Sequence, residues 1–460
     1  MNSVADLLLA RAAEHPRLPA VLHDDAAVSW AELAARAEAL ASRLQARGVK
    51  PGHRVAVDVG SAVAAAERLL AVWLADAIAV PLAAHLPPAE ARRRRDASRC
   101  VLHAAAGALH PLAEHPPSDA GAGLVVFTSG TTGQSRGAWL DLSALEASAA
   151  SVVHATSLRP GDRWLSPLPF AHVGGIGVLV RCLQTGATAS VMDGFDPAGA
   201  NARLRCGTTH ASFVGRMVER LLADVGAAPA FPDDLRFVLV GGGPVPPALL
   251  ARARAAGLPA VATYGLTEAG STVTLADPAQ EPSPRCDAGR PLPGRRVRLA
   301  RDGTIEVAGP TLMRGYDGEP PLPMDGWFST GDLGEWTPDG RLRILDRRVD
   351  LIVSGGENVY PAEVEGILAR HPSIDEIALV AWPDPSWGQR VVGVVRWRGA
   401  PEEAGVAAFA AAELTPPQRP RTWITAAEPL PRNALGKLDR LAIRARWGSP
   451  LLPTSPDQSE

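Results

Sequence analysis

The sequence has few of the features that mark secreted, zinc-binding or membrane-embedded proteins. Its 460 residues contain only four cysteines, far apart and without a CxxC pair, so neither a zinc site nor a disulfide framework is indicated. Its apolar runs are too short to span a bilayer. The first thirteen residues include Asp6 and lack a basic start followed by a long apolar run, which favours an amphipathic helix over a signal peptide. We therefore expect a cytoplasmic protein without membrane insertion.

The sequence also lacks a strong charge of either sign. With 21% charged residues and a formal net charge of -3, nucleic acid is not an expected partner. Arg92 to Arg95 form the one basic run, in a segment where Pro87, Pro88 and Glu90 are typical of a helix start. A solvated helix face is the favoured interpretation of this run, and contact with the phosphates of a ligand is the alternative.

The chain is too long for one ordinary core, so a large domain and a smaller one are expected. Ala-rich segments of helical period alternate with short Val/Leu runs, which predicts an α/β fold with layered sheets and helices. The pattern places Gly241 to Gly243 and Tyr264 at the ends of strands. Ligands bind at strand ends in open α/β sheets.

After about Ala300 the pattern changes to short strands, with possible hairpin turns at Asp302-Gly303, Asp325-Gly326 and Asp339-Gly340. A helix is expected over 361–370. We predict a large N-terminal domain over 1–346 and a small α+β C-terminal domain over 347–447. The tail, 448–460, is rich in Pro and Ser and is predicted to be disordered.

The strongest local signal is LVVFTSGTTGQSRGAWL, in which a short apolar strand precedes a loop rich in glycine and hydroxyl groups. Glycines let backbone N–H groups approach phosphate oxygens, hydroxyls add hydrogen bonds, and an arginine adds charge. The candidate phosphate-binding residues are Thr128, Ser129, Gly130, Thr131, Thr132, Gly133 and Arg136. A Ser/Thr/Gly linker is the alternative, which the strand directly before the loop makes less favourable. The loop is not a Walker A motif.

This loop resembles the phosphate loop of adenylate-forming enzymes, whose usual form is TSG[ST]TGxPKG. Here Ser135 replaces the proline and Arg136 replaces the lysine, which keeps the positive charge. The segment ATYGLTEAG resembles a second motif of the family. The resemblance implies that Tyr264, followed by Gly265, stacks on adenine, that Thr267 contacts the α-phosphate, and that Glu268 binds Mg²⁺.

Three further segments resemble family motifs in the family's order. GWFSTGDLGEW implies that Asp332 binds the ribose hydroxyls. In ILDRRVDLIVSGGENVYPAEVE, Arg347 would also bind ribose, Val349 would lie at a hinge, and Gly355-Gly356 would line the route of the CoA thiol. LPRNALGKLDR implies that Lys437 contacts the carboxylate and the α-phosphate. Each segment alone could be a turn or a solvated side chain, whereas five in order identify the chain as a member of this superfamily.

The resemblance implies an ATP-dependent acid:coenzyme A ligase. Such an enzyme activates a carboxylic acid as an acyl-adenylate with Mg²⁺ and ATP, and transfers the acyl group to coenzyme A as co-substrate. Lys437 and Arg136 fall in different predicted domains, so adenylation is expected to require domain closure. The sequence leaves the oligomeric state open, a homodimer included.

Four segments look most like the o-succinylbenzoate:CoA ligases of menaquinone biosynthesis: WLSPLPFAHVGGIGVLVRCLQTGATASV, THASFVGRMVERLL, LRFVLVGGGPVPPALL and LDRRVDLIVSGGENVYPAEVE. His172, Gly174 and Gly175 stand where amino-acid-activating domains carry an Asp, which disfavours an amino acid. The donors expected for a second substrate carboxylate are His172, Ser212 and Arg216. Gly242 and Gly243 belong to the same resemblance and are expected to bind the nucleotide cofactor. Two alternatives stay open: a ligase for another aryl or medium-chain acid, and a non-catalytic nucleotide-binding relative.

Overall fold

The computed structural model describes most of the chain and divides it into two compact units. It describes residues 4–24, 26–84, 86–119, 121–128, 135–225, 231–243, 245–280, 287–323, 325–347, 350–354, 357–433 and 436–448. The larger unit comprises Met1–Ala300, Glu306–Thr330 and Trp336–Arg343. The smaller unit comprises Arg301–Ile305, Gly331–Glu335 and Ile344–Glu460. The predicted domain boundary after residue 346 and the predicted disorder of the tail stay predictions.

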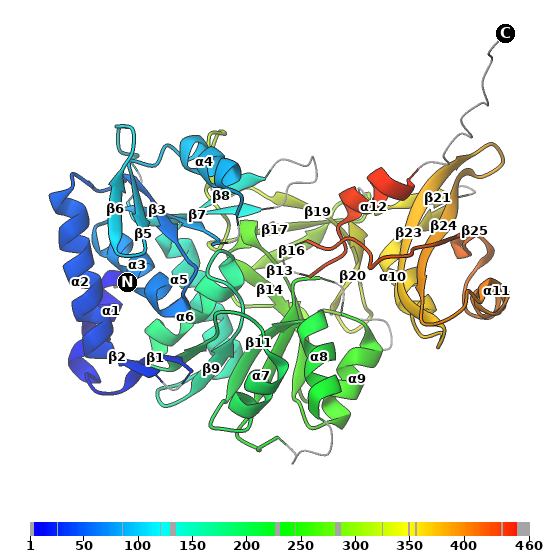
Figure 1. Cartoon of the computed structure of the whole chain (residues 1–460), viewed down its shortest axis with the longest axis horizontal. Coiled ribbons are helices and arrows are strands. Elements are labelled where there is room, and N and C mark those ends of the chain that lie inside the picture. The colour runs from blue at the N-terminus through cyan, green and yellow to red at the C-terminus, as the bar shows by residue number, and fades with distance from the viewer. Residues whose placement is uncertain are drawn as a thin grey trace, which may run out of the picture. The chain divides into compact units, whose positions relative to one another are not determined.

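Two large sheets and the helices on them make up most of the larger unit (Figure 1). The first has nine strands, in the order β15 (Arg290–Pro291), β14 (Ser271–Leu275), β13 (Ala260–Leu266), β12 (Phe237–Gly241), β11 (His210–Val214), β9 (Arg163–Ser166), β10 (Thr188–Val191), β1 (Pro19–His23) and β2 (Ala26–Ser29). Strands β13 to β1 of this order pair in parallel, and antiparallel partners flank them on both sides.

The second sheet has seven strands, in the order β18 (Gly315–Tyr316), β8 (Arg136–Asp141), β7 (Gly123–Thr128), β4 (Ile78–Leu82), β3 (Arg54–Asp58), β5 (Leu102–Ala105) and β6 (Ala108–Pro111). Its parallel strands are apolar along their length because both faces are covered, as β4 shows with all five residues buried. A smaller sheet has the order β16 (Arg296–Leu299), β17 (Thr304–Ala308), β19 (Phe328–Trp336) and β20 (Leu342–Arg347).

Helices connect the strands of the larger unit. They are α1 (Val4–Glu14), α2 (Trp30–Ala46), α3 (Ala62–Leu74), α4 (Pro88–Ala97), α5 (Leu142–Thr156), α6 (Val173–Thr185), α7 (Pro197–Leu204), α8 (Gly215–Val225) and α9 (Pro247–Ala255). Local sequence sets several of their ends. Ser29 and Glu32 form a capping box at the start of α2. Gly186 ends α6 in the left-handed conformation, with a φ of 75°.

Two of the three predicted hairpin turns are correct. Asp302-Gly303 connects β16 to β17, and Asp339-Gly340 connects β19 to β20; both glycines have positive φ, as tight hairpin turns require. The third prediction, at Asp325-Gly326, is wrong. This turn connects β18 to β19, which belong to different sheets.

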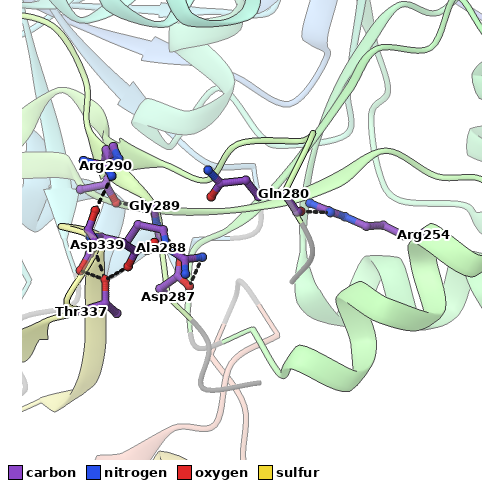
Figure 2. A network of polar contacts seen from close by, with 10 residues as sticks. Arg254, Gln280, Asp287, Ala288, Gly289, Arg290, Thr337 and Asp339 are labelled. Carbon is purple, nitrogen blue, oxygen red and sulfur yellow. Dashed lines mark hydrogen bonds and ion pairs between the residues drawn. The ribbon is translucent and has the colours of Figure 1, made fainter. Parts of the chain in front are cut away.

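Polar contacts hold the turn at Asp339 in place (Figure 2). The Thr337 hydroxyl donates to the Asp339 carboxylate over 2.6 Å, and Arg290 donates to the Asp339 carbonyl oxygen. The strand after this turn, β20, is bound to the residue before β15, because Leu342 N donates to the Gly289 carbonyl oxygen over 2.8 Å. Side chains thus satisfy backbone groups that the turn leaves unpaired.

The smaller unit contains a five-stranded sheet. Its order is β22 (Glu357–Val359), β21 (Ile352–Ser354), β24 (Gly388–Trp397) and β23 (Ile374–Asp384), and β25 (Thr422–Thr425) also pairs with β24. The helices of this unit are α10 (Pro361–Leu368), α11 (Glu403–Glu413) and α12 (Arg440–Trp447). Helix α10 ends two residues before the end of the predicted helix.

One largely buried ion pair connects α10 to α12. The Arg440 guanidinium donates to both oxygens of Glu365 over 2.5 and 2.7 Å, and Leu379 N donates to the same carboxylate. This bidentate geometry compensates the burial of both charges. Across the described residues of both units, no helix is long and apolar enough to cross a membrane.

Candidate active site

The predicted phosphate loop connects two neighbouring antiparallel strands. β7 ends at Thr128 and β8 begins at Arg136, and these two residues lie directly opposite each other in the ladder. The connecting residues include Ser129, Gly130, Thr131, Thr132 and Gly133, which lie outside the described residues. The pairing of Thr128 with Arg136 fixes the positions of the two residues between which the loop runs.

Arg136 binds two residues that the sequence analysis did not identify. One guanidinium nitrogen donates to both Glu319 oxygens at 2.8 Å each. The guanidinium carbon also lies 3.4 Å from the centre of the Tyr316 ring, a close cation–π contact. The side chains of Arg136 and Glu319 are 43% and 50% exposed, so phosphate can compete with this ion pair.

Tyr316 also connects Arg136 to the predicted magnesium ligand. Its hydroxyl donates to Glu268 Oε1 over 2.8 Å. Burial and the nearby Glu268 charge raise the pKa of the Tyr316 phenol, so the hydroxyl keeps its proton and remains a donor. Residues 136, 268 and 316 thus form one continuous group.

The predicted nucleotide residues gather at the ends of two adjacent parallel strands. β12 ends at Gly241, directly before Gly242 and Gly243, and its neighbour β13 contains Tyr264 and Gly265. Thr267 and Glu268 follow in the short helix η1 (Thr267–Ala269). Tyr264 is buried. The prediction that these residues lie at strand ends is correct.

Gly265 is required by the packing of this edge. A Cβ added there would lie 2.1 Å from the Ser271 carbonyl oxygen, a distance that no side chain can adopt. The YG pair therefore has a structural reason in addition to its resemblance to the family motif.

Glu268 fits the chemistry of a magnesium ligand. Mg²⁺ in nucleotide sites takes one or two carboxylates and completes its shell with phosphate oxygens and water. No group of three or more His, Cys, Asp or Glu side chains suited to a metal occurs within the described ranges. A single carboxylate that is connected to Arg136 through Tyr316 matches a metal that would be bound together with the phosphates of a nucleotide.

The other residues that the sequence predicts to bind the nucleotide or to line the route of the coenzyme A thiol belong to the smaller unit. Asp332 is buried in β19, and Arg347 ends β20. Val349, Gly355 and Gly356 lie outside the described residues. Lys437 follows a turn in which Asn433 N donates to the Lys437 carbonyl oxygen over 2.8 Å and Gly436 has a φ of 74°. This turn fixes the backbone that carries the lysine.

The predicted substrate residues differ in burial. His172 is the N-cap of α6, and Gly174 and Gly175 lie in the first turn of this helix, after Val173. A Cβ at Gly175 would lie 2.5 Å from the Leu168 carbonyl oxygen, so close backbone packing requires glycine there. Ser212 is buried and accepts a hydrogen bond from Trp164 Nε1 over 2.9 Å. Arg216 is 52% exposed and lies 3.6 Å from Glu219, which makes it the weakest of the three candidate donors.

A buried arginine that the sequence analysis missed contacts Trp164, the residue that donates to Ser212. Arg181, on α6, is only 2% exposed, and its guanidinium carbon lies 4.9 Å from the centre of the Trp164 ring. Within the described residues, its guanidinium donates one hydrogen bond, a long one of 3.5 Å to the Thr272 hydroxyl. In the described part of the chain, no carboxylate pairs with Arg181 and its Nε has no hydrogen-bond partner. Burial lowers the pKa of Arg181 to about 10, so it remains charged at neutral pH.

A second buried arginine provides a comparison. Arg295 is 7% exposed, and burial lowers its pKa to about 10 as well. Its two terminal nitrogens donate to Ser151 and Ser148 over 2.8 and 2.9 Å. The Nε of Arg295 has no hydrogen-bond partner among the described residues, as in Arg181, but both of its terminal nitrogens are well supplied with acceptors. Arg181 has an uncompensated charge, which is costly in an apolar interior.

The basic run on α4 lies beside the end of the phosphate loop. Arg93 donates to both oxygens of Glu90 over 2.6 and 2.8 Å and to the Ser135 hydroxyl over 2.6 Å. Hydrogen bonds from Arg93 are the main reason that the pKa of Glu90 falls to about 2. Arg92 is exposed. The run is a solvated face at Arg92 and an anchor for the loop end at Arg93.

Comparison with known proteins identifies the family. The family model described as AMP-binding enzyme matches residues 8–116 and 103–317. The chain belongs to the AMP-binding enzyme family. The model for the AMP-binding enzyme C-terminal domain matches residues 363–437. The predicted superfamily and the predicted α/β fold with a C-terminal domain are therefore confirmed.

Several members of the AMP-binding enzyme family are similar to this chain over most of its length. A 2-succinylbenzoate–CoA ligase of Bacillus cereus is 31% identical over 96% of this chain and 98% of its own. One of Geobacillus kaustophilus is 36% identical over 70% of this chain and 68% of its own. The structure of o-succinylbenzoate coenzyme A synthetase from Bacillus subtilis, in complex with ATP and magnesium ion, has a TM-score of 0.85 at 27% identity. It covers 95% of this chain and 99% of its own.

Proposed function

We propose that this chain is an AMP-forming ligase that converts 2-succinylbenzoate (o-succinylbenzoate) to its coenzyme A thioester in menaquinone biosynthesis. The observation that carries the proposal is the likeness to proteins of that name over 96% of the chain. The buried, uncompensated guanidinium of Arg181 supports the choice of a substrate with two carboxylates. A cytoplasmic location, predicted from the sequence, belongs to the same proposal.

In the first step, one carboxylate of the acid attacks the α-phosphorus of ATP and pyrophosphate leaves. Negative charge accumulates on the phosphoryl oxygens, so fixed cations stabilise the transition state. We assign this stabilisation to Arg136 and Lys437. Glu268 would hold Mg²⁺, which neutralises phosphate charge when bound. Asp332 and Arg347 are proposed to hold the ribose.

In the second step, the coenzyme A thiol attacks the acyl-adenylate carbonyl carbon, AMP leaves and the thiol proton passes to solvent or to a nearby base. We propose that the C-terminal domain turns about Val349 between the steps, so that Gly356 replaces Lys437 at the reacting centre and Gly355 and Gly356 line the route of the thiol. Residues without side chains leave room for the pantetheine arm. The domain bounds in this proposal are those predicted from the sequence.

The second carboxylate of the substrate needs a cationic partner, and we assign that role to Arg181. Its burial and its lack of a carboxylate partner make it a stronger candidate than Arg216, which is exposed and lies near Glu219. A buried guanidinium without a counter-ion gains most from a carboxylate that arrives with the ligand. Ser212 is connected to the same place through Trp164.

The proposal is tested by product analysis. The purified protein is incubated with Mg²⁺, ATP, o-succinylbenzoate and coenzyme A, and the products are identified by mass spectrometry. AMP, pyrophosphate and the thioester are expected together, and omission of coenzyme A should leave enzyme-bound acyl-adenylate. Formation of ADP, or thioester formation without ATP, would exclude the proposed reaction.

A further inference from the structure

We propose that Tyr316 is a positioning residue of the nucleotide site, which orients Glu268 for Mg²⁺ through its hydroxyl and supports Arg136 through its ring. The inference deepens the proposed function and rests on it. It concerns a residue that none of the five sequence motifs contains. Its basis is the geometry of four side chains: Arg136, Glu268, Tyr316 and Glu319.

The backbone fixes the position of Tyr316 relative to the phosphate loop. β18 pairs antiparallel with β8, with Gly315 opposite Trp139 and Tyr316 opposite Ala138. Ala138 lies two residues after Arg136, and residues two apart in a strand point to the same face of the sheet. Tyr316 and Arg136 therefore lie on the same face, as diagonal neighbours on adjacent strands. The contact between Tyr316 and Arg136 is therefore set by strand pairing and does not depend on a loop.

A second backbone contact fixes Glu268 to the same segment. Met313 N donates to the Glu268 carbonyl oxygen over 2.8 Å. The Glu268 main chain is thus attached three residues before Tyr316, and the Glu268 side chain meets the Tyr316 hydroxyl at 2.8 Å. The segment 313–316 thus binds both the main chain and the side chain of Glu268, which restricts the rotamers that the carboxylate can adopt.

The hydroxyl and the ring of Tyr316 do different things. The hydroxyl donates to Oε1 of Glu268, which orients the carboxylate as the outer partners of metal ligands commonly do. The ring supports the guanidinium of Arg136 at 3.4 Å. Because phenylalanine keeps the ring and leucine removes it, the two roles can be separated by substitution.

Glu319 completes the group and explains why Arg136 needs support. The two residues form an ion pair through two 2.8 Å contacts. When a phosphate takes the place of Glu319 beside Arg136, the guanidinium loses its carboxylate partner and keeps the ring. The ring therefore holds the arginine in place as its anionic partner changes.

The test is equilibrium binding of α,β-methylene-ATP, measured by calorimetry over a range of Mg²⁺ concentrations with the full-length protein. Tyr316→Phe should raise the Mg²⁺ concentration at half-maximal binding by about tenfold or more, with nucleotide affinity at saturating Mg²⁺ within about twofold of wild type. Tyr316→Leu should weaken nucleotide binding at saturating Mg²⁺ as well. In a Glu268→Gln background, Tyr316→Phe should have no further effect on the Mg²⁺ dependence.

Tyr360→Phe is the matched control, because it removes a tyrosine hydroxyl in the smaller unit, and it should leave the Mg²⁺ dependence unchanged. A Tyr316→Phe protein with the wild-type Mg²⁺ dependence would overturn the inference. So would equal weakening at every Mg²⁺ concentration. If Tyr316→Leu does not fold, Tyr316→Phe alone decides. A wild-type protein that does not bind the Mg²⁺-nucleotide would contradict the proposed function instead.

Discussion

Substitution of Arg181 is expected to impair the use of a dicarboxylic acid far more than the use of a monoacid. In Arg181→Leu a buried guanidinium is removed and the second carboxylate of o-succinylbenzoate is left without its partner. Removal of one partner of a buried, hydrogen-bonded charge pair costs roughly 2–5 kcal/mol. The expected loss in kcat/KM is therefore about 30-fold to several thousand-fold for o-succinylbenzoate, and at most a few-fold for benzoate.

The same variant has a second expected signature, in stability. Arg181 is 2% exposed and has no carboxylate partner in the described ranges, so its charge is a cost to the ligand-free fold. Arg181→Leu should therefore unfold at the same or a higher urea concentration than wild type, while Arg181→Lys retains the charge without the planar donors. Loss of activity together with unchanged stability separates a binding role from a structural one.

The assay is pyrophosphate release with each acid, followed by urea unfolding monitored by tryptophan fluorescence. Arg295→Leu is the matched control, since Arg295 is also buried and its two terminal nitrogens donate to Ser151 and Ser148. This control should lower stability and affect both acids alike. Equal losses of kcat/KM for o-succinylbenzoate and benzoate in Arg181→Leu would refute the assignment of Arg181.

Three further outcomes are expected. Lys437→Ala should abolish acyl-adenylate formation but leave thioester formation from supplied acyl-adenylate; equal loss of both half-reactions would count against its role. Arg136→Lys should be tolerated because it keeps the charge, whereas Arg136→Ala should raise the KM for ATP; unchanged ATP kinetics in Arg136→Ala would remove it from the site. Burial lowers the pKa of His210 from 6.5 to about 4, so the unfolded state takes up a proton first as the pH falls. The contribution of neutral His210 to the free energy of unfolding is fully present above pH 6.5, and about 3 kcal/mol of it is lost progressively as the pH falls to 4. Urea unfolding at pH 7.5 and 5 should show a smaller loss in His210→Gln than in wild type, and an equal loss would exclude His210 as the cause.

The sequence predicted the parts of the site that depend on local pattern. The strand before Thr128 and the strand ends at Gly241 and near Tyr264 follow from apolar runs and glycines, and the structure has them at those places. The turns at Gly303 and Gly340 also follow from local chemistry, because both positions need a positive φ.

The partners that complete the site could not be predicted in this way. Tyr316 meets Glu268 and Arg136 only because β18 pairs with β8, a long-range contact without a local signal. Arg181 lies in the apolar run of α6, and its lack of a counter-ion is a property of packing. The wrong hairpin at Asp325-Gly326 has a related cause, since a turn motif does not specify which sheet the next strand joins.

The central claim is the identity of the acid, and a comparison of kcat/KM over a panel of acids tests it most directly. The panel contains o-succinylbenzoate, benzoate, 4-coumarate, octanoate and α-amino acids, each assayed by pyrophosphate release with Mg²⁺, ATP and coenzyme A. A site that holds a buried donor for a second carboxylate rejects monoacids, since they leave that donor unpaired. We predict the highest kcat/KM for o-succinylbenzoate, and a higher value for any monoacid or amino acid would contradict the account.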